Sequence, residues 1–298
     1  MSSRDLGLSM DERRRLLEAN AAAVRYYRWE LLRATDGWPL EYLKAHGAES
    51  VLSAASPWKV GYAPSAWSNL VDHLRGQGFG YGTLVRAGLM TWNEHDEAVD
   101  QHRDKLMLVA RDRRLAAVGF VGIGPDGNAR SASPVTAIHR PANVLVGIDE
   151  QRNLLARGAV PVIVDSPMDA IAVSNAGMEA GGSWAGIPLC GGDLSTSHVK
   201  TLKEFSATDK VIVALGGSRA EQDRSAGYVL DLAFFFDRVR GFELPAGDSL
   251  AGLAQKEHGG VGLNKVLRDA RPLMTYRATG RGFVTLQSAD LDPPAPDL

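Results

Sequence analysis

The sequence predicts an α/β protein in which a mixed N-terminal part precedes an open sheet flanked by helices. The apolar run 160–164 has the length of a buried parallel strand, and Pro167 suits the first turn of a helix after it. A second apolar run, 210–215, precedes another helical segment. Because strands and helices alternate in this half, we expect its strands to be parallel.

A long helix is expected near the N-terminus. Ser9 and Glu12 have the spacing of a capping box at its start. Apolar residues then recur at helical spacing: Leu16, Leu17, Val24, Tyr27 and Leu31. The run Arg13–Arg15 is interpreted as a solvated face of this helix, because acidic residues flank it. Shorter helices are predicted between glycine and proline breaks, at 39–45, 65–75 and 81–87.

The middle of the chain predicts a β-hairpin and a loop. Two apolar segments within 105–122 flank the arginine-rich stretch 111–114, which we expect to be a solvated turn rather than a phosphate site. A turn at 125–128 leads into a polar loop at 128–134.

The chain is divided into three predicted regions. They are an N-terminal subdomain (1–150), a sheet domain (151–275) and a C-terminal extension (276–298). The end of the extension is acidic and rich in proline, which is typical of disordered segments.

Composition limits the class of protein and its partners. A chain of 298 residues with 45% hydrophobic residues can bury a sizeable core. No apolar run approaches the roughly 18 residues of a membrane span, and the start does not resemble a secretory signal. The single cysteine, Cys190, excludes an intrachain disulfide, so a cytoplasmic protein without membrane contact is expected. The net charge of −2 means that nucleic-acid binding would require a local basic patch.

The most informative motif follows the strand at 160–164. The segment Asp165-Ser166-Pro167-Met168-Asp169 resembles the first motif of Toprim domains in bacterial DNA primases, where the first acid is glutamate. Further segments resemble short blocks of the same family, in the same order: 42–47, 60–64, 87–89, 100–107, 119–123, 145–148, 187–189 and 244–248. The chain is therefore identified as a member of the primase-core lineage. This implies a mixed α/β N-terminal subdomain followed by a Toprim sheet flanked by helices.

The family's metal site is incomplete in this sequence. The resemblance implies that Mg²⁺ is held by Asp165, Asp169 and Asp248 for nucleotidyl transfer. The family's Asp-x-Asp motif on the second strand is replaced at Gly216 and Ser218. Asp165 is also one methylene shorter than the family glutamate, which withdraws its carboxylate by about 1.5 Å. We expect an impaired site and a protein that leans towards being non-catalytic, with Mg²⁺ as cofactor if activity survives and none otherwise.

Each surviving acid also has a structural interpretation. Asp165 is as well suited to cap the helix that begins near Pro167 as to bind a metal. Asp169 could bond to backbone or to Arg219, and Asp248 could make a local bond within its turn. The cysteine-containing zinc module that opens full-length bacterial primases has no counterpart in this sequence.

The resemblance also assigns a nucleic-acid face. It places Arg103 and Lys105 on the template side of a groove, with Arg140 beside them. The implied partner is single-stranded DNA or a DNA/RNA hybrid, bound weakly, and a replication protein is a further candidate. The role implied is replication or maintenance of DNA, such as that of a mobile element. Two alternatives stay open: an active Mg²⁺-dependent primase that uses the three aspartates, and a non-catalytic scaffold that contacts only protein.

Other conspicuous residues have plainer interpretations. Ser195 and His198 are expected at a helix start, with Ser195 or Thr196 as the cap, rather than as a nucleophile and its base. Cys190 is expected to be a buried thiol. Most of the six tryptophans are expected to pack in the core, although any of them could stack on bases.

Overall fold

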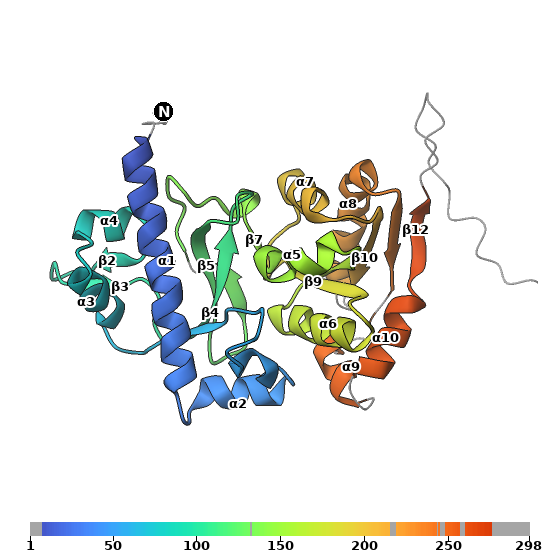
Figure 1. Ribbon diagram of the computed structural model, residues 1–298, viewed down its shortest axis with the longest axis horizontal. Coiled ribbons are helices and arrows are strands. Elements are labelled where there is room, and N and C mark those ends of the chain that lie inside the picture. Colours follow the sequence, from blue (N-terminus) through green and yellow to red (C-terminus); the bar gives the residue numbers. More distant parts are fainter. Residues whose placement is uncertain are drawn as a thin grey trace, which may run out of the picture.

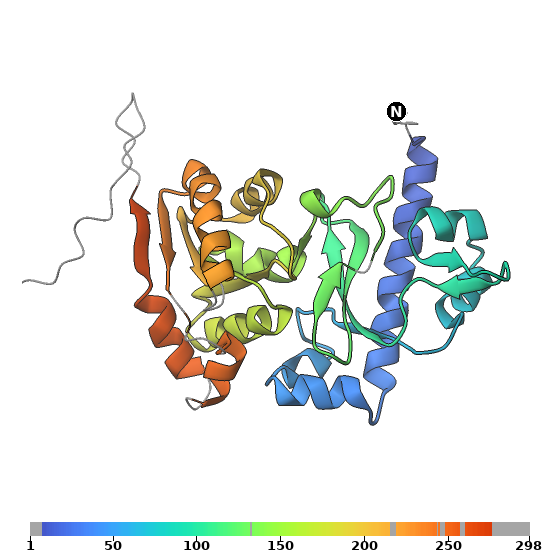
Figure 2. The ribbon, with the colours of Figure 1, turned by 180° about the vertical axis from the view of Figure 1, so that it is seen from behind.

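The computed structural model describes residues 8–131, 133–214, 219–242, 244, 248–256 and 260–275. Two halves lie side by side along the longest axis, the N-terminal half on the left of Figure 1 and the C-terminal half on the right. Each half is built around its own five-stranded sheet. The view from behind in Figure 2 shows the same two halves with their sides exchanged.

The N-terminal half packs a long helix against an antiparallel sheet of strand order β1-β4-β5-β6, with β7 also paired to β4. Its elements are α1 (Met10–Arg33), α2 (Trp38–Ala45), η1 (Glu49–Leu52), β1 (Gly61–Ala63), α3 (Asn69–Gly76), α4 (Tyr81–Arg86), β2 (Met90–Trp92), β3 (Ala98–Asp100), β4 (Lys105–Arg111), β5 (Ala117–Ile123), β6 (Ala129–Ser131), η2 (Pro141–Asn143) and β7 (Leu145–Val146).

Helix α1 confirms the predicted capping box. The Ser9 hydroxyl accepts the Glu12 N–H, and the Glu12 carboxylate accepts the Ser9 N–H. Leu16, Tyr27 and Leu31 on the inner face are almost completely buried. The helix therefore starts where local sequence dictates and is held by its apolar stripe.

Two predicted boundaries are wrong. The helix expected from residue 65 begins only at Asn69, because the Asp100 carboxylate accepts the N–H groups of Leu70 and Val71 and fixes the first turn there. The stretch 128–134, predicted to be a loop, contains strand β6, which pairs antiparallel with β5. In both cases the boundary depends on a residue or strand distant in sequence, Asp100 for α3 and β5 for β6.

The C-terminal half is a sheet of order β12-β11-β10-β8-β9 with helices on both faces. Its elements are α5 (Ile148–Ala156), β8 (Val160–Val164), α6 (Pro167–Glu179), β9 (Trp184–Pro188), α7 (Thr196–Phe205), β10 (Lys210–Ala214), α8 (Arg219–Phe235), β11 (Arg238–Gly241), α9 (Leu250–Lys256), α10 (Gly260–Arg268) and β12 (Arg271–Thr275). Strands β8, β9, β10 and β11 are parallel, and β12 is antiparallel to β11.

Strands β8, β9 and β10 are buried on both faces, as the apolar runs of β8 and β10 predict. Val162 and Val164 belong to the core with α6, α9 and α10, whereas Ile163 belongs to the core with α5, α7 and α8. Strands β8 and β10 are direct neighbours, with Val164 opposite Ala214. The carboxyl ends of β8 and β10, Val164 and Ala214, therefore lie at the same edge of the sheet.

The predicted boundary at residue 150 falls within α5, just after β7 joins the N-terminal sheet. The C-terminal extension from residue 276 lies outside the described residues. Among the helices that are described, none is both long and apolar enough to cross a membrane.

Candidate nucleic-acid and metal site at the junction of the two halves

Asp165 follows the last residue of β8 and lines a cavity at the junction of the two halves. It was predicted to be either a cap of α6 or a metal ligand, and the cap interpretation is wrong. Ser166 occupies the N-cap position, where its hydroxyl accepts the Met168 N–H at 3.1 Å. The backbone carbonyl of Asp165 accepts the N–H of Cys190 at 2.8 Å, which ties the segment after β8 to that after β9.

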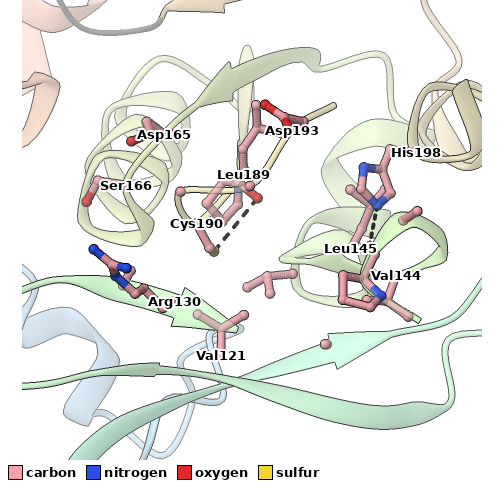
Figure 3. A pocket seen from close by; sticks show the side chains of 18 of the residues that line it. Val121, Arg130, Val144, Leu145, Asp165, Ser166, Leu189, Cys190, Asp193 and His198 are labelled. Atoms are coloured by element: carbon pink, nitrogen blue, oxygen red, sulfur yellow. Dashed lines mark hydrogen bonds between the residues drawn. The ribbon is translucent and has the colours of Figure 1, made fainter. Parts of the chain in front are cut away.

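The cavity has a volume of about 780 Å³ and is lined by residues of both the N-terminal and the C-terminal half. Strands β5 and β6 contribute Val121 and Arg130, and the segments after β8 and β9 contribute Asp165 and Asp193, as Figure 3 shows. His198 of α7 closes one end. Arg130 was not predicted, because a single arginine in a polar stretch carries no signal until β6 pairs with β5.

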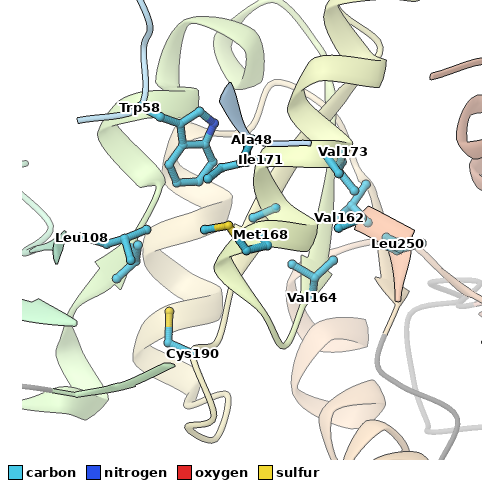
Figure 4. Close-up of a cluster of buried hydrophobic side chains, with 14 of the residues drawn as sticks. Ala48, Trp58, Leu108, Val162, Val164, Met168, Ile171, Val173, Cys190 and Leu250 are labelled. Atoms are coloured by element: carbon cyan, nitrogen blue, oxygen red, sulfur yellow. The ribbon is translucent and has the colours of Figure 1, made fainter. Parts of the chain in front are cut away.

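A shared hydrophobic core below the cavity joins the two halves. Trp58 and Leu108 come from the N-terminal half, and Met168 and Ile171 come from α6 (Figure 4). All four side chains are buried. Since close-packed interiors resist deformation, this core fixes the two walls of the cavity relative to one another.

Cys190 belongs to the same core and is buried, as predicted. Burial raises the pKa of its thiol, and the nearby Asp165 carboxylate acts in the same direction. The thiol therefore stays protonated at neutral pH and is a poor nucleophile.

Asp169 lies one helical turn beyond Asp165 but does not line the cavity. Its carboxylate is 8% exposed and accepts the N–H of Ala251, in the first turn of α9, at 2.8 Å. Burial raises its pKa, while the backbone bonds from Ala251 and Leu250 act in the opposite direction. Asp169 is thus placed as an acceptor at the N-terminus of a helix about 80 residues away in sequence.

Asp248 is also engaged outside the cavity. Its carboxylate lies 2.6 Å from the Lys256 ammonium, at the other end of α9. Gly216 and Ser218 lie outside the described residues, as does the side chain of Arg219. Within the described ranges, no three acidic, histidine or cysteine side chains are arranged to hold a metal ion. Asp169 and Asp248 are thus each engaged by a residue of α9, whereas Asp165 lines the cavity.

None of the three predicted nucleic-acid residues, Arg103, Lys105 and Arg140, lines the cavity. The guanidinium of Arg103 lies over the ring of Trp67, 4.3 Å from its centroid. Lys105 is the first residue of β4, beside β1, and is half-buried. Arg140 immediately precedes η2 and is exposed.

The tryptophans are less buried than predicted. Trp58 and Trp184 pack in the core, but Trp67 is 62% exposed, and Trp29 and Trp92 also present large exposed surfaces. The Trp67 ring is therefore available to stack on a base.

Helix α7 holds η2 at the edge of the cavity. Ser195 is its N-cap, as one of the two predicted alternatives had it. A capping box forms there, since the Ser195 hydroxyl accepts the His198 N–H and the His198 Nδ1 accepts the Ser195 N–H. The His198 Nε2–H donates to the Pro141 carbonyl at 2.8 Å, and the Ser195 hydroxyl donates to the Ala142 carbonyl at 2.6 Å. Burial lowers the pKa of His198, so the ring is neutral at physiological pH and keeps this arrangement. Arg140, immediately before η2, is positioned by these bonds.

The chain is similar to known DNA primases in sequence and in fold. The family model for the N-terminal domain of the DNA primase catalytic core matches residues 26–152. This part of the chain belongs to the catalytic-core family of DNA primases. The primase-core chain is also 29% identical over 251 residues to a DNA primase of Synechococcus elongatus, and 30% identical over 237 residues to that of Deinococcus radiodurans. These matches cover 82% and 78% of the chain but only 35% and 39% of the two relatives.

Solved structures confirm the fold of the primase-core chain. The catalytic domain of a DnaG primase bound to single-stranded DNA superposes with a TM-score of 0.73 at 23% identity, covering 89% of this chain and 84% of that one. The RNA polymerase domain of Mycobacterium tuberculosis primase DnaG gives a TM-score of 0.71 at 25% identity, covering 87% and 84%. The mixed α/β primase-core architecture predicted from sequence is therefore the one observed.

Proposed function

We propose that this primase-core chain binds single-stranded DNA or a DNA/RNA hybrid across Arg103, Lys105 and Arg140, in the replication or maintenance of DNA, such as that of a mobile element. The observation that carries the proposal is the exposed Trp67 ring with the Arg103 guanidinium against it. A stacking surface for a base and a cation for a phosphate then stand at one place, which is how single strands are bound without sequence preference. A structural neighbour is described as bound to single-stranded DNA, which supports the same partner.

The binding is weak, because the rest of the molecule does not attract a polyanion. The net charge is −2, so only a few local cations favour the strand. A replication protein as a second partner stays a prediction, because no described contact bears on it.

Reversing two of these charges is expected to weaken binding strongly. Arg103→Glu with Lys105→Glu should lower affinity for a single strand by at least about tenfold at low salt, and should reduce the salt slope by roughly 0.7 for each lost phosphate contact. Trp67→Ala should weaken binding by about 1–3 kcal/mol through lost stacking. Fluorescence anisotropy titrations at several salt concentrations measure both effects.

The matched control is Lys265→Glu with Arg268→Glu on α10. Both residues are exposed and lie on α10 in the C-terminal half, whereas Arg103, Lys105 and Arg140 belong to the N-terminal half, so the net charge changes equally without a change on the proposed face. An equal loss of DNA affinity in the test variant and in the control variant would contradict the proposal and favour a protein-binding scaffold. No binding of DNA by the unaltered chain at low salt would do the same.

We also propose that the metal site is impaired. Asp169 and Asp248 already have partners in α9, and the sequence carries Gly216 and Ser218 in place of two family acids. The unaltered chain should therefore show no Mg²⁺ binding at millimolar concentration by calorimetry and no primer synthesis on single-stranded DNA. Restoring the family residues, with Asp165→Glu, Gly216→Asp and Ser218→Asp together, should produce measurable Mg²⁺ binding, because added carboxylates are the ligands Mg²⁺ prefers.

Nucleotide incorporation by the unaltered chain that Asp165→Ala abolishes would show that the site is active. Asp269→Asn, at an exposed position outside the cavity, serves as the control for loss of a carboxylate.

A further inference from the structure

A second cavity, of about 700 Å³, lies on the outer side of the junction between the two halves. Four of its lining residues are cations: Arg13 from α1, Arg113 and Arg114 from the turn after β4, and Lys200 from α7. The sequence alone favoured solvated faces for both arginine runs. The fold brings them together, because Arg13 forms an ion pair with Asp112, 99 residues away, at 3.1 Å.

Two of the four cations are neutralised and two are not. Arg13 is paired with Asp112, and Arg113 is paired with Glu204. Arg114 and Lys200 are both exposed, and neither makes an ion pair with any described residue. The cavity therefore keeps an excess of positive charge.

The turn that presents Arg114 is already fixed. The Asp112 carboxylate accepts the N–H groups of Arg114 and Ala116, at 2.9 and 3.0 Å, and its other oxygen holds Arg13. Little backbone freedom is lost when a ligand is bound there, so the cost of ordering the site is small.

This outer cavity adjoins the one that Asp165 lines. The same two elements separate them: Pro141 and Ala142 of η2 face the inner cavity, and Asn143 faces the outer one. In α7, Ser195 and His198 line the inner cavity, whereas Ser197, Lys200 and Thr201 line the outer one. A strand that crosses η2 beside the exposed Arg140 passes directly from one to the other.

The lining chemistry indicates the part of the strand that is contacted. Guanidinium, ammonium, amide and hydroxyl groups are those that proteins use on phosphate oxygens. Among the described residues, the lining contains no aromatic ring on which a base could stack, and no aliphatic side chain that would anchor an acidic peptide. The match is therefore to a sugar–phosphate backbone.

We propose that the outer cavity is a second backbone site, where Arg114 and Lys200 bind phosphates of the strand that continues from Arg140 over η2. This inference rests on the proposed function, because it extends the same bound strand. It also predicts a length dependence, since only a strand long enough to cross η2 gains the outer contacts.

The test compares strands of about 8 and about 25 nucleotides, the shorter matching one typical site. Arg114→Glu with Lys200→Glu should weaken binding of the longer strand roughly tenfold at low salt and reduce its salt slope by about 1.4, with no effect on the shorter strand. Lys265→Glu with Arg268→Glu is again the control for net charge. All four positions are exposed, so the variants should fold, which circular dichroism verifies.

A second measurement reports proximity directly. Cys190 is the only cysteine and is buried, so a photocrosslinker attached after Arg114→Cys reacts at that position alone. It should crosslink the longer strand and not the shorter one. One contrary result is that Arg103→Glu with Lys105→Glu weakens the binding of both strands while Arg114→Glu with Lys200→Glu weakens the binding of neither. That result refutes the outer site and leaves the proposed function standing. If neither strand binds, both are refuted.

Discussion

Gly186→Ala is expected to destabilise the protein by roughly 3 kcal/mol or more, because the fold leaves no room for a methyl group at this position. Gly186 lies in β9, where helix α6 crosses the sheet. A Cβ at this position would lie 2.2 Å from the carbonyl oxygen of Ala170 and 2.6 Å from its Cα. Because these are backbone atoms of a helix, a rotamer change cannot relieve the overlap, and α6 must move off the sheet.

Urea unfolding followed by circular dichroism measures this loss. The matched control is Gly227→Ala in α8, where an added Cβ meets nothing within 4 Å. That change should stabilise the protein by about 0.5–1 kcal/mol, because alanine restricts the unfolded chain and favours the helix. Similar unfolding midpoints for the two variants would show that α6 does not pack on β9 as described.

Asp169→Ala is expected to cost about 2 kcal/mol, because it leaves the buried N–H of Ala251 without its acceptor. Asp169→Asn keeps an acceptor oxygen at the same place and removes the buried charge. The asparagine variant should therefore be at least as stable as the unaltered protein at neutral pH, in contrast to the alanine variant.

The pH dependence of the Asp169→Asn effect has a definite sign. Burial raises the pKa of Asp169 in the folded protein above its value in the unfolded chain, so the folded protein binds this proton more tightly. The unaltered protein then loses stability as pH rises from about 4 through the raised pKa, and the asparagine variant does not. The advantage of Asp169→Asn should grow across that window and stay constant above it.

Urea midpoints measured over this pH range test the prediction, with Asp237→Asn at an exposed position as the control. If asparagine destabilises as much as alanine at neutral pH, the negative charge itself is required. A cation near Asp169 would then have to be sought, and the proposal of an impaired metal site would be weakened.

The candidate site was only partly predictable. Asp165 at the end of β8 follows from an apolar run and the position of the carboxyl ends in a parallel sheet. The direction of the Asp169 side chain cannot be predicted in this way, because it depends on a hydrogen bond to α9, about 80 residues later in the chain. Arg130 was missed for a similar reason, since its place beside the cavity depends on the pairing of β6 with β5.

The sequence by itself determined the elements whose signals are local. The capping box of α1, the paired apolar strands β8 and β10, and the cap at Ser195 are encoded within a few residues, because periodicity and capping act over one or two turns. Only the tertiary structure decided which charges meet. The pairing of Arg13 with Asp112, the outer cavity that results, and the exposure of Trp67 depend on long-range packing. Packing of this kind is settled by the whole core at once, and no segment carries it alone.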